Sequence, residues 1–182
     1  MRKFICSLAV LGAVTLVPAI QNVKAEATPA RHASAVLQNV SGDVVGTARF
    51  VEDDAGKVHI SVHASGLSTG LHGIHVHTVG SCVTGTTAFD GAGGHFNPTG
   101  AQHGLENDHG AHAGDLPNLE VNEAGIGRLN TTTDHLTLGA GSTSLFDADG
   151  SAVVIHAGPD DQISNPAGNS GGRVACGVIT LQ

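Results

Sequence analysis

The sequence predicts an all-β protein, an eight-stranded antiparallel Greek-key β-sandwich or barrel with two long functional loops. Short segments rich in Val, Ile, Leu and Thr recur along the chain, and clusters of Gly, Asp and Asn separate them. No segment has the apolar repeat of a helix over three turns. Eight such segments in 182 residues are typical of a sandwich or barrel. In order, the predicted strands are 33–40, 44–52, 57–64, 73–78, 119–122, 126–132, 151–157 and 176–181.

Two long segments, 80–118 and 157–173, contain no predicted strand. Loops of this length inside a compact domain are usually functional. The strand before the first loop carries His75 and His77 at positions i and i+2, so both side chains are expected on one face. Metal ligation would supply free energy to order such loops.

The N-terminus has the features of a secretory signal peptide. Two basic residues precede an apolar run, and small residues favour cleavage after Ala25, with Ala27 as the alternative. The run is too short and too interrupted for a transmembrane anchor. We therefore expect a periplasmic or secreted protein that is free of the membrane after cleavage. The predicted segments are a signal peptide (1–25), a short extension (26–33) and one domain (34–182).

Without the signal peptide, five basic and sixteen acidic residues remain, a formal charge of −11. Such an acidic domain is not expected to bind nucleic acid. Two cysteines also remain, Cys82 and Cys176. An even pair in an oxidising compartment favours a disulfide, and metal ligation is the alternative.

Six histidines and one aspartate form a spaced array that is too large for one metal ion and suits two. Imidazole suits copper and zinc, and a carboxylate completes a harder site. His109 lies three residues before His112 and is the alternative to it. His72 is out of phase with the strand pair and is expected to hold a loop by hydrogen bonds. The array consists of His75, His77, His95, His103, His112, Asp115 and His156.

Several motifs around this array, in order and spacing, resemble the copper/zinc superoxide dismutases. The segments Gly80-Ser-Cys82 and Gly91-Ala-Gly-Gly-His95 look more like the bacterial secreted branch of that family than the cytosolic eukaryotic one. The resemblance runs from about Ser34 to the C-terminus. The motifs are GLHGIHVH (70–77), GHFNP (94–98), HAGDL (112–116), VIH (154–156) and GRVACGV (172–178).

The resemblance implies one copper and one zinc per subunit, with superoxide as the substrate. Copper would be held by His75, His77, His95 and His156. Zinc would be held by His95, His103, His112 and Asp115, so that His95 bridges the two metals. The implied supporting residues are Asp160, which links ligands of both metals, Arg173 beside the copper, and the disulfide pair Cys82 and Cys176.

The chemistry calls for the same residue types. Dismutation needs a metal that cycles by one electron, which copper does and zinc does not. His95 can accept a proton, and the Arg173 guanidinium can dock a small anion, so these two residues are the predicted catalytic groups. No lysine lies between Asp160 and Arg173, so anion attraction is expected to rest on Arg173, with Lys57 and Arg128 as alternative contributors.

Two other functions are alternatives for this set of residues. A non-catalytic copper/zinc-binding domain on the same fold is the main alternative, although such a relative would be expected to lose Arg173 or a copper ligand. A blue-copper electron carrier expects a cysteine ligand and often a methionine, and the only methionine is Met1. The sequence is compatible with a monomer and with a homodimer.

Overall fold

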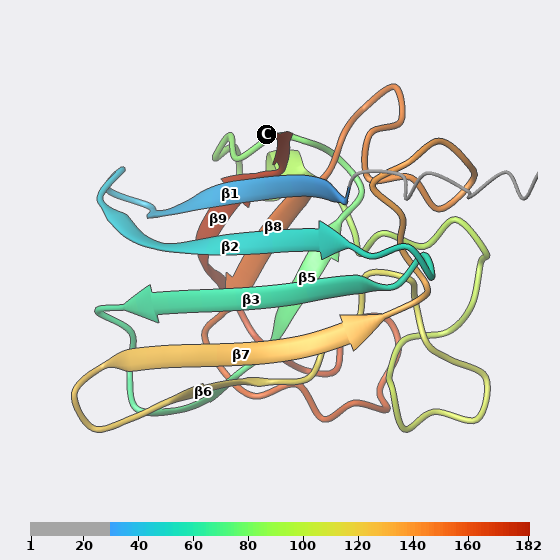
Figure 1. The fold of residues 1–182 in the computed structure, drawn as a ribbon. Coiled ribbons are helices and arrows are strands. Elements are labelled where there is room, and N and C mark those ends of the chain that lie inside the picture. Colours follow the sequence, from blue (N-terminus) through green and yellow to red (C-terminus); the bar gives the residue numbers. More distant parts are fainter. Residues whose placement is uncertain (1–29) are drawn as a thin grey trace, which may run out of the picture.

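The computed structural model describes residues 30–182, which form ten strands and one short 3-10 helix (Figure 1). The predicted signal peptide and residues 26–29 of the predicted extension lie outside the described residues, whereas residues 31–33 belong to the first strand. The elements are β1 (Arg31–Asn39), β2 (Val44–Glu52), β3 (Val58–Ser65), β4 (Gly70–His72), β5 (Ile74–His77), η1 (Asp90–Ala92), β6 (Leu119–Val121), β7 (Ile126–Thr133), β8 (Ala152–His156), β9 (Arg173–Val178) and β10 (Thr180–Leu181).

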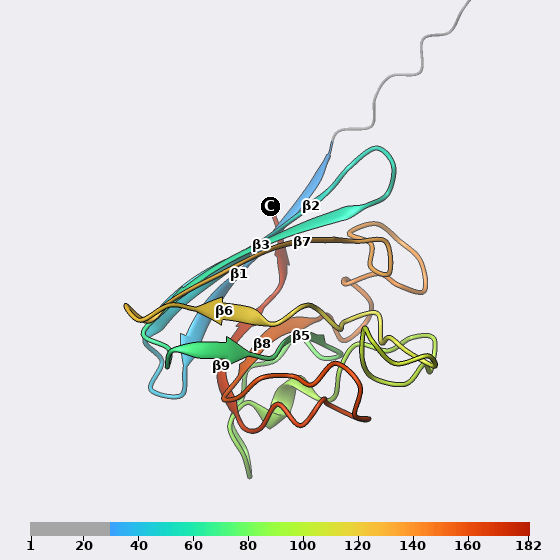
Figure 2. The same ribbon diagram turned by 90° about the horizontal axis from the view of Figure 1, so that it is seen from below.

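The strands pair antiparallel in the order β4-β6-β7-β3-β2-β1-β9-β8-β5, and β10 pairs with β1. Neighbours in this order are often distant in sequence, as in a Greek key. The two edge strands, β4 and β5, are separated by Gly73 alone, whose backbone N–H donates to Gly158 O at 2.8 Å. The sheet therefore bends into a nearly closed barrel, and Figure 2 shows β1, β2, β3 and β7 as one layer facing β5, β8 and β9. The predicted fold class is confirmed.

Two details differ from the eight predicted strands. β4 was not predicted, because Gly and Ser in 66–72 are typical of a turn; its three residues become a strand by pairing with β6. The last predicted strand starts earlier, at Arg173, and is divided at Ile179. The Ile179 N–H donates to Ser151 O at 2.9 Å, outside the regular ladders that flank it.

The core lies between the two layers. Side chains of β3 alternate strictly between buried and exposed, as expected for a strand with one face in water. β5 and β8 are instead buried along their whole length. Ile74 and Val76 pack into the main core, whereas His75 and His77 alternate with them and are buried on the opposite face of the strand. This second buried face provides the position for the candidate site.

A third long connection joins β7 to β8 and is fixed to the barrel by a buried carboxylate. Glu52, at the end of β2, accepts hydrogen bonds from Thr137 Oγ1 at 2.6 Å and from the Leu138 N–H at 3.0 Å. Within residues 30–182, no helix has the length and apolar character needed to cross a membrane.

Candidate metal centre

Three histidines of the array lie on two paired strands beneath the long loops. His75 and His77 lie on β5 and His156 ends β8, where β5 and β8 pair through Ile74 and Ile155. All three rings are almost fully buried. The alternation of side chains along β5 therefore places His75 and His77 on the same face, as the i, i+2 spacing predicts.

The first long loop brings the other four residues to this face. Two isolated bridges attach the loop to β5, one between His77 and His95 and one between His75 and Asp115. The His75 and His95 rings stack with their centroids 3.8 Å apart, and the His103 and His112 rings lie edge-on to His95. The structure thus brings together all seven residues of the predicted array.

Four ring nitrogens converge, and none of them has a hydrogen-bond partner among residues 30–182. They are buried, and one ligand atom from each of the four histidines lies within 4.8 Å of the others. An unpartnered buried nitrogen is costly unless something binds it. Because imidazole nitrogens are the preferred ligands of copper and zinc, these four fit a transition-metal ion. These nitrogens, which form the first group of ligand atoms, are His75 Nδ1, His77 Nε2, His95 Nε2 and His156 Nε2.

The opposite nitrogen of each ring on the strands is hydrogen-bonded, which fixes the tautomer. His77 Nδ1 lies 2.9 Å from Gly93 O and His156 Nδ1 lies 3.1 Å from Gly171 O. His75 Nε2 lies 2.7 Å from Asp160 Oδ2. Since these oxygens only accept, each bonded nitrogen carries the proton and its partner nitrogen offers a lone pair.

Burial keeps these rings neutral. Loss of solvation for the charged ring is the main cause, and it lowers the pKa of His75 to about 3, of His77 to about 2 and of His156 to about 4. Neutral rings are the form that ligates a metal. The three lone pairs are therefore available at neutral pH.

A second group of ligand atoms surrounds Asp115. Its Oδ1 lies 2.9 Å from His95 Nδ1, 3.0 Å from His103 Nδ1 and 3.3 Å from His112 Nδ1. Burial alone would raise the pKa of Asp115, but hydrogen bonds from His103 and His95 outweigh it and hold the pKa far below its usual range. Three nitrogens and one carboxylate oxygen are a typical donor set for a tetrahedral zinc site.

His75 also comes close to this second group, since His75, His95, His103 and Asp115 each offer one atom within 4.8 Å of the others. His75 Nε2 is hydrogen-bonded to Asp160 and His75 Nδ1 belongs to the first group. His112 has neither engagement, so His112 fits the second group better.

Asp160 connects the two groups. Its Oδ2 accepts from His75 Nε2 at 2.7 Å, and its Oδ1 accepts from His103 Nε2 at 3.0 Å. Burial lowers the pKa of His103, but hydrogen bonds to Asp115 and Asp160 outweigh this and raise it to about 9. One buried carboxylate thus orients one ring from each group, as the sequence resemblance implies.

The Arg173 guanidinium is held beside the first group by backbone carbonyls. Its Nη1 donates to Phe89 O at 2.6 Å and its Nη2 donates to Gly93 O at 2.5 Å. Gly93 O also accepts from His77 Nδ1, so Arg173 and His77 share an acceptor. The remaining N–H groups of the half-buried guanidinium are free to bind an anion.

Burial and hydrogen bonds distinguish the remaining histidines near the array from the ligand candidates. His112 is buried whereas His109 is exposed, which favours His112 of the two alternatives. His72 is buried, with Nδ1 at 2.6 Å from His156 O and Nε2 at 3.2 Å from the hydroxyl oxygen of Ser68. It therefore holds the loop at Ser68 against the end of β8 by hydrogen bonds, and the predicted loop-holding role is confirmed.

A disulfide joins Cys82 to Cys176, with the two Cα atoms 5.7 Å apart. It links the start of the first long loop to β9. Cys176 packs against a small apolar cluster that includes Phe89 and Ala92, close to the carbonyls that hold Arg173. Of the two alternatives for this cysteine pair, the structure shows the disulfide.

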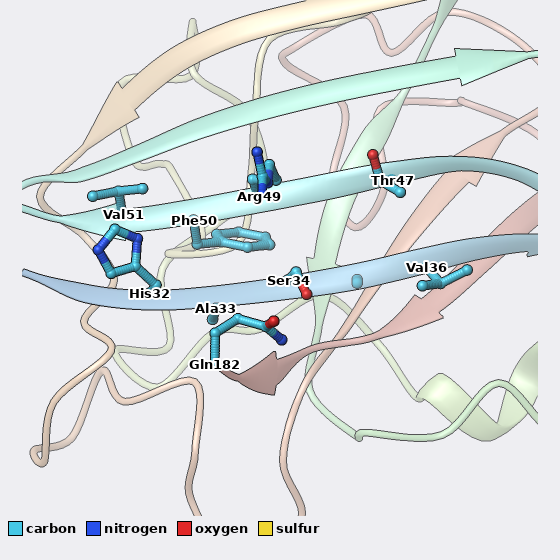
Figure 3. Close-up of a pocket in the computed structure, with 10 residues that line it drawn as sticks. His32, Ala33, Ser34, Val36, Thr47, Arg49, Phe50, Val51 and Gln182 are labelled. Atoms are coloured by element: carbon cyan, nitrogen blue, oxygen red, sulfur yellow. The ribbon is translucent and has the colours of Figure 1, made fainter.

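A large surface hollow, of about 660 Å³, lies elsewhere, on β1 and β2 near the C-terminus (Figure 3). Small or polar side chains such as Ser34 and Thr47 line it, together with Arg49. It contains none of the seven residues of the array. The candidate site lies instead on β5 and β8, in the other layer of the barrel.

Comparisons with known proteins agree with this geometry. The sequence model of the copper/zinc superoxide dismutase family (SODC) matches residues 44–179. Superoxide dismutase (Cu-Zn) 2 of Aquifex aeolicus is 46% identical over 149 residues, which cover 81% of this chain and 85% of that protein.

Solved structures give the same result. A SOD-like protein from Bacillus subtilis has a TM-score of 0.74 and 39% identity, covering 80% of this chain and 96% of that one. Its double mutant, with a tyrosine and a proline replaced by histidine, has a TM-score of 0.75 and 41% identity, covering 80% and 95%. The chain therefore belongs to the copper/zinc superoxide dismutase family and is an oxidoreductase.

Proposed function

We propose that this protein dismutates superoxide to dioxygen and hydrogen peroxide, outside the cytoplasm, with one copper and one zinc per chain. Copper is assigned to His75, His77, His95 and His156. Zinc is assigned to a second set that shares His95. That set consists of His95, His103, His112 and Asp115.

One observation carries this proposal. Of the six buried side-chain atoms without a hydrogen-bond partner in residues 30–182, four are the convergent ring nitrogens of the first group. A histidine cluster that served only packing would satisfy these nitrogens with carbonyls or hydroxyls, as His72 does with His156 O and the Ser68 hydroxyl. A copper ion bound there would supply one-electron chemistry, and a zinc ion beside Asp115 would keep its oxidation state.

Two residues of the chain are assigned the remaining functions, which are proton transfer and binding of the anion. His95 faces Asp115 through Nδ1 and the first group through Nε2, so its Nε2 is the atom that takes up a proton and delivers it to the product. Arg173 binds and orients the superoxide anion, because its guanidinium is fixed by two carbonyls and keeps N–H groups free. These are the two residues for which the sequence predicts a catalytic role.

The proposed compartment rests on two features. The first is the predicted signal peptide, and the second is the disulfide, which persists in oxidising compartments. Cell fractionation and N-terminal sequencing test this: we expect the mature chain outside the cytoplasm and starting at Glu26, or at Thr28 if cleavage follows Ala27. A chain that keeps its first residues and stays in the cytoplasm would refute the assignment.

Metal analysis combined with superoxide turnover tests the activity. Protein loaded with both metals should contain one copper and one zinc and should be active by pulse radiolysis. His112→Ala should lose zinc, whereas the matched variant His109→Ala should retain it, because only His112 is buried against Asp115. Full metal content without turnover would instead favour the non-catalytic metal-binding alternative.

A further inference from the structure

The backbone N–H and C=O of Asp160 are both hydrogen-bonded to a side chain that the sequence motifs do not include. The Asn118 Nδ2 donates to Asp160 O at 2.8 Å, and the Asp160 N–H donates to Asn118 Oδ1 at 2.8 Å. No other group in residues 30–182 hydrogen-bonds to these two backbone atoms. Because one planar amide binds both atoms, it fixes the position and the direction from which the Asp160 side chain departs.

Asn118 also belongs to the segment that carries Asp115. Only two residues separate them, and Leu119 then starts β6. The segment that leads into β6 therefore positions Asp115, the carboxylate of the second group, and through Asn118 also holds Asp160, which joins both groups. Movement of this segment would disturb His75 and His103 together.

Gly168 lies directly over the hydrogen bond from His103 to Asp160. A Cβ atom added there would overlap with Asp160 Oδ1 and lie 2.7 Å from His103 Nε2. The backbone φ of Gly168 is +59°, which also disfavours a side chain. Only glycine lets the second long loop cross at this point while the hydrogen bond remains.

We propose that Asn118 and Gly168 are positioning residues that set the Asp160 bridge and thereby couple the two metal groups. The proposal rests on the two-metal function above. Partners behind metal ligands typically change metal affinity by about 10–100-fold when removed. Because Asp160 orients one ring of each group, loss of its support affects both metals at once, unlike loss of a ligand that serves one metal.

The test compares Asn118→Ala and Gly168→Ala with two matched controls. Asn122→Ala also removes two hydrogen bonds between an asparagine and the backbone, since the Ala124 and Ile126 N–H groups both donate to Asn122 Oδ1 at 3.0 Å in the β6–β7 turn. Gly66→Ala imposes a side chain at a φ of +73° with no atom within 4 Å of the added Cβ. The controls thus carry the same local costs without touching Asp160.

Three readouts follow each variant. Zinc affinity is measured by competition with a chromophoric chelator, and the copper environment by electron paramagnetic resonance. Imidazole ¹H–¹⁵N NMR of the metal-free protein reports whether the Nε2–H groups of His75 and His103 remain hydrogen-bonded. Asn118→Asp keeps the shape, removes the donor and sets a negative charge against Asp160 O, so it replaces Asn118→Ala if that variant fails to fold.

We expect Asn118→Ala and Gly168→Ala to weaken zinc binding by about tenfold or more, to alter the copper spectrum and to lose the two Nε2–H signals. The controls should match the wild type in all three. The proposal is overturned if the variants behave like their controls. Failure of the wild type to bind a second metal would refute the proposed function instead, and the metal-free NMR signals would still decide the role of Asn118 and Gly168.

Discussion

Removal of the Cys82–Cys176 disulfide should destabilise the metal-free protein strongly. Its half-cystines are 94 positions apart, and closing a loop of that length stabilises the folded state by about 4.7 kcal/mol in the chain-entropy model. For a domain of this size 1 kcal/mol corresponds to ~2–4 °C, so the melting temperature should fall by roughly 10–20 °C. Cys82→Ser is the cleaner variant, because Cys176 is buried and a serine there adds an unsatisfied hydroxyl.

Urea denaturation of metal-free protein measures this loss without the contribution of bound metal. Wild-type protein unfolded in a reductant is the matched control and should have the same midpoint as Cys82→Ser. Zinc retention should also fall, because the disulfide anchors the loop that carries the zinc residues. A midpoint for Cys82→Ser equal to that of the oxidised wild type would refute the chain-entropy reasoning for this disulfide.

Three further predictions follow from the structure. Arg173→Ile should slow superoxide turnover and remove most of its dependence on ionic strength while both metals stay bound. Arg128 lies on β7 in the other layer, so Arg128→Ile should keep the wild-type dependence of turnover on salt. An unchanged salt dependence in Arg173→Ile would show that other residues attract the anion. Glu52→Ala should cost about 1–3 kcal/mol in urea denaturation, because the Leu138 N–H loses its partner; a loss below that range would mean water replaces the carboxylate. NMR of metal-free protein should show His75 protonated at Nε2 and His77 at Nδ1; the opposite tautomers would contradict the assigned copper nitrogens.

The fold class follows from local sequence because strand periodicity is a short-range property. The bounds of β2 match the prediction, since turn residues mark both of its ends. β4 could not be found in the same way, because its residues resemble a turn and become a strand only through pairing with β6. The division at Ile179 also depends on pairing, which no local pattern records.

The sequence by itself identified the seven residues of the array, because ligand chemistry depends on residue type and on the spacing of motifs. Asp160 and Arg173 came from the family resemblance, and the structure places them beside the histidines they were expected to serve. The tertiary structure alone decided which ring nitrogens stay unpartnered and which of His109 and His112 is buried, because both depend on groups far apart in the chain. The hydrogen bonds between Asn118 and Asp160 were also found only in the tertiary structure, because the local sequence around either residue does not record a contact 42 positions away.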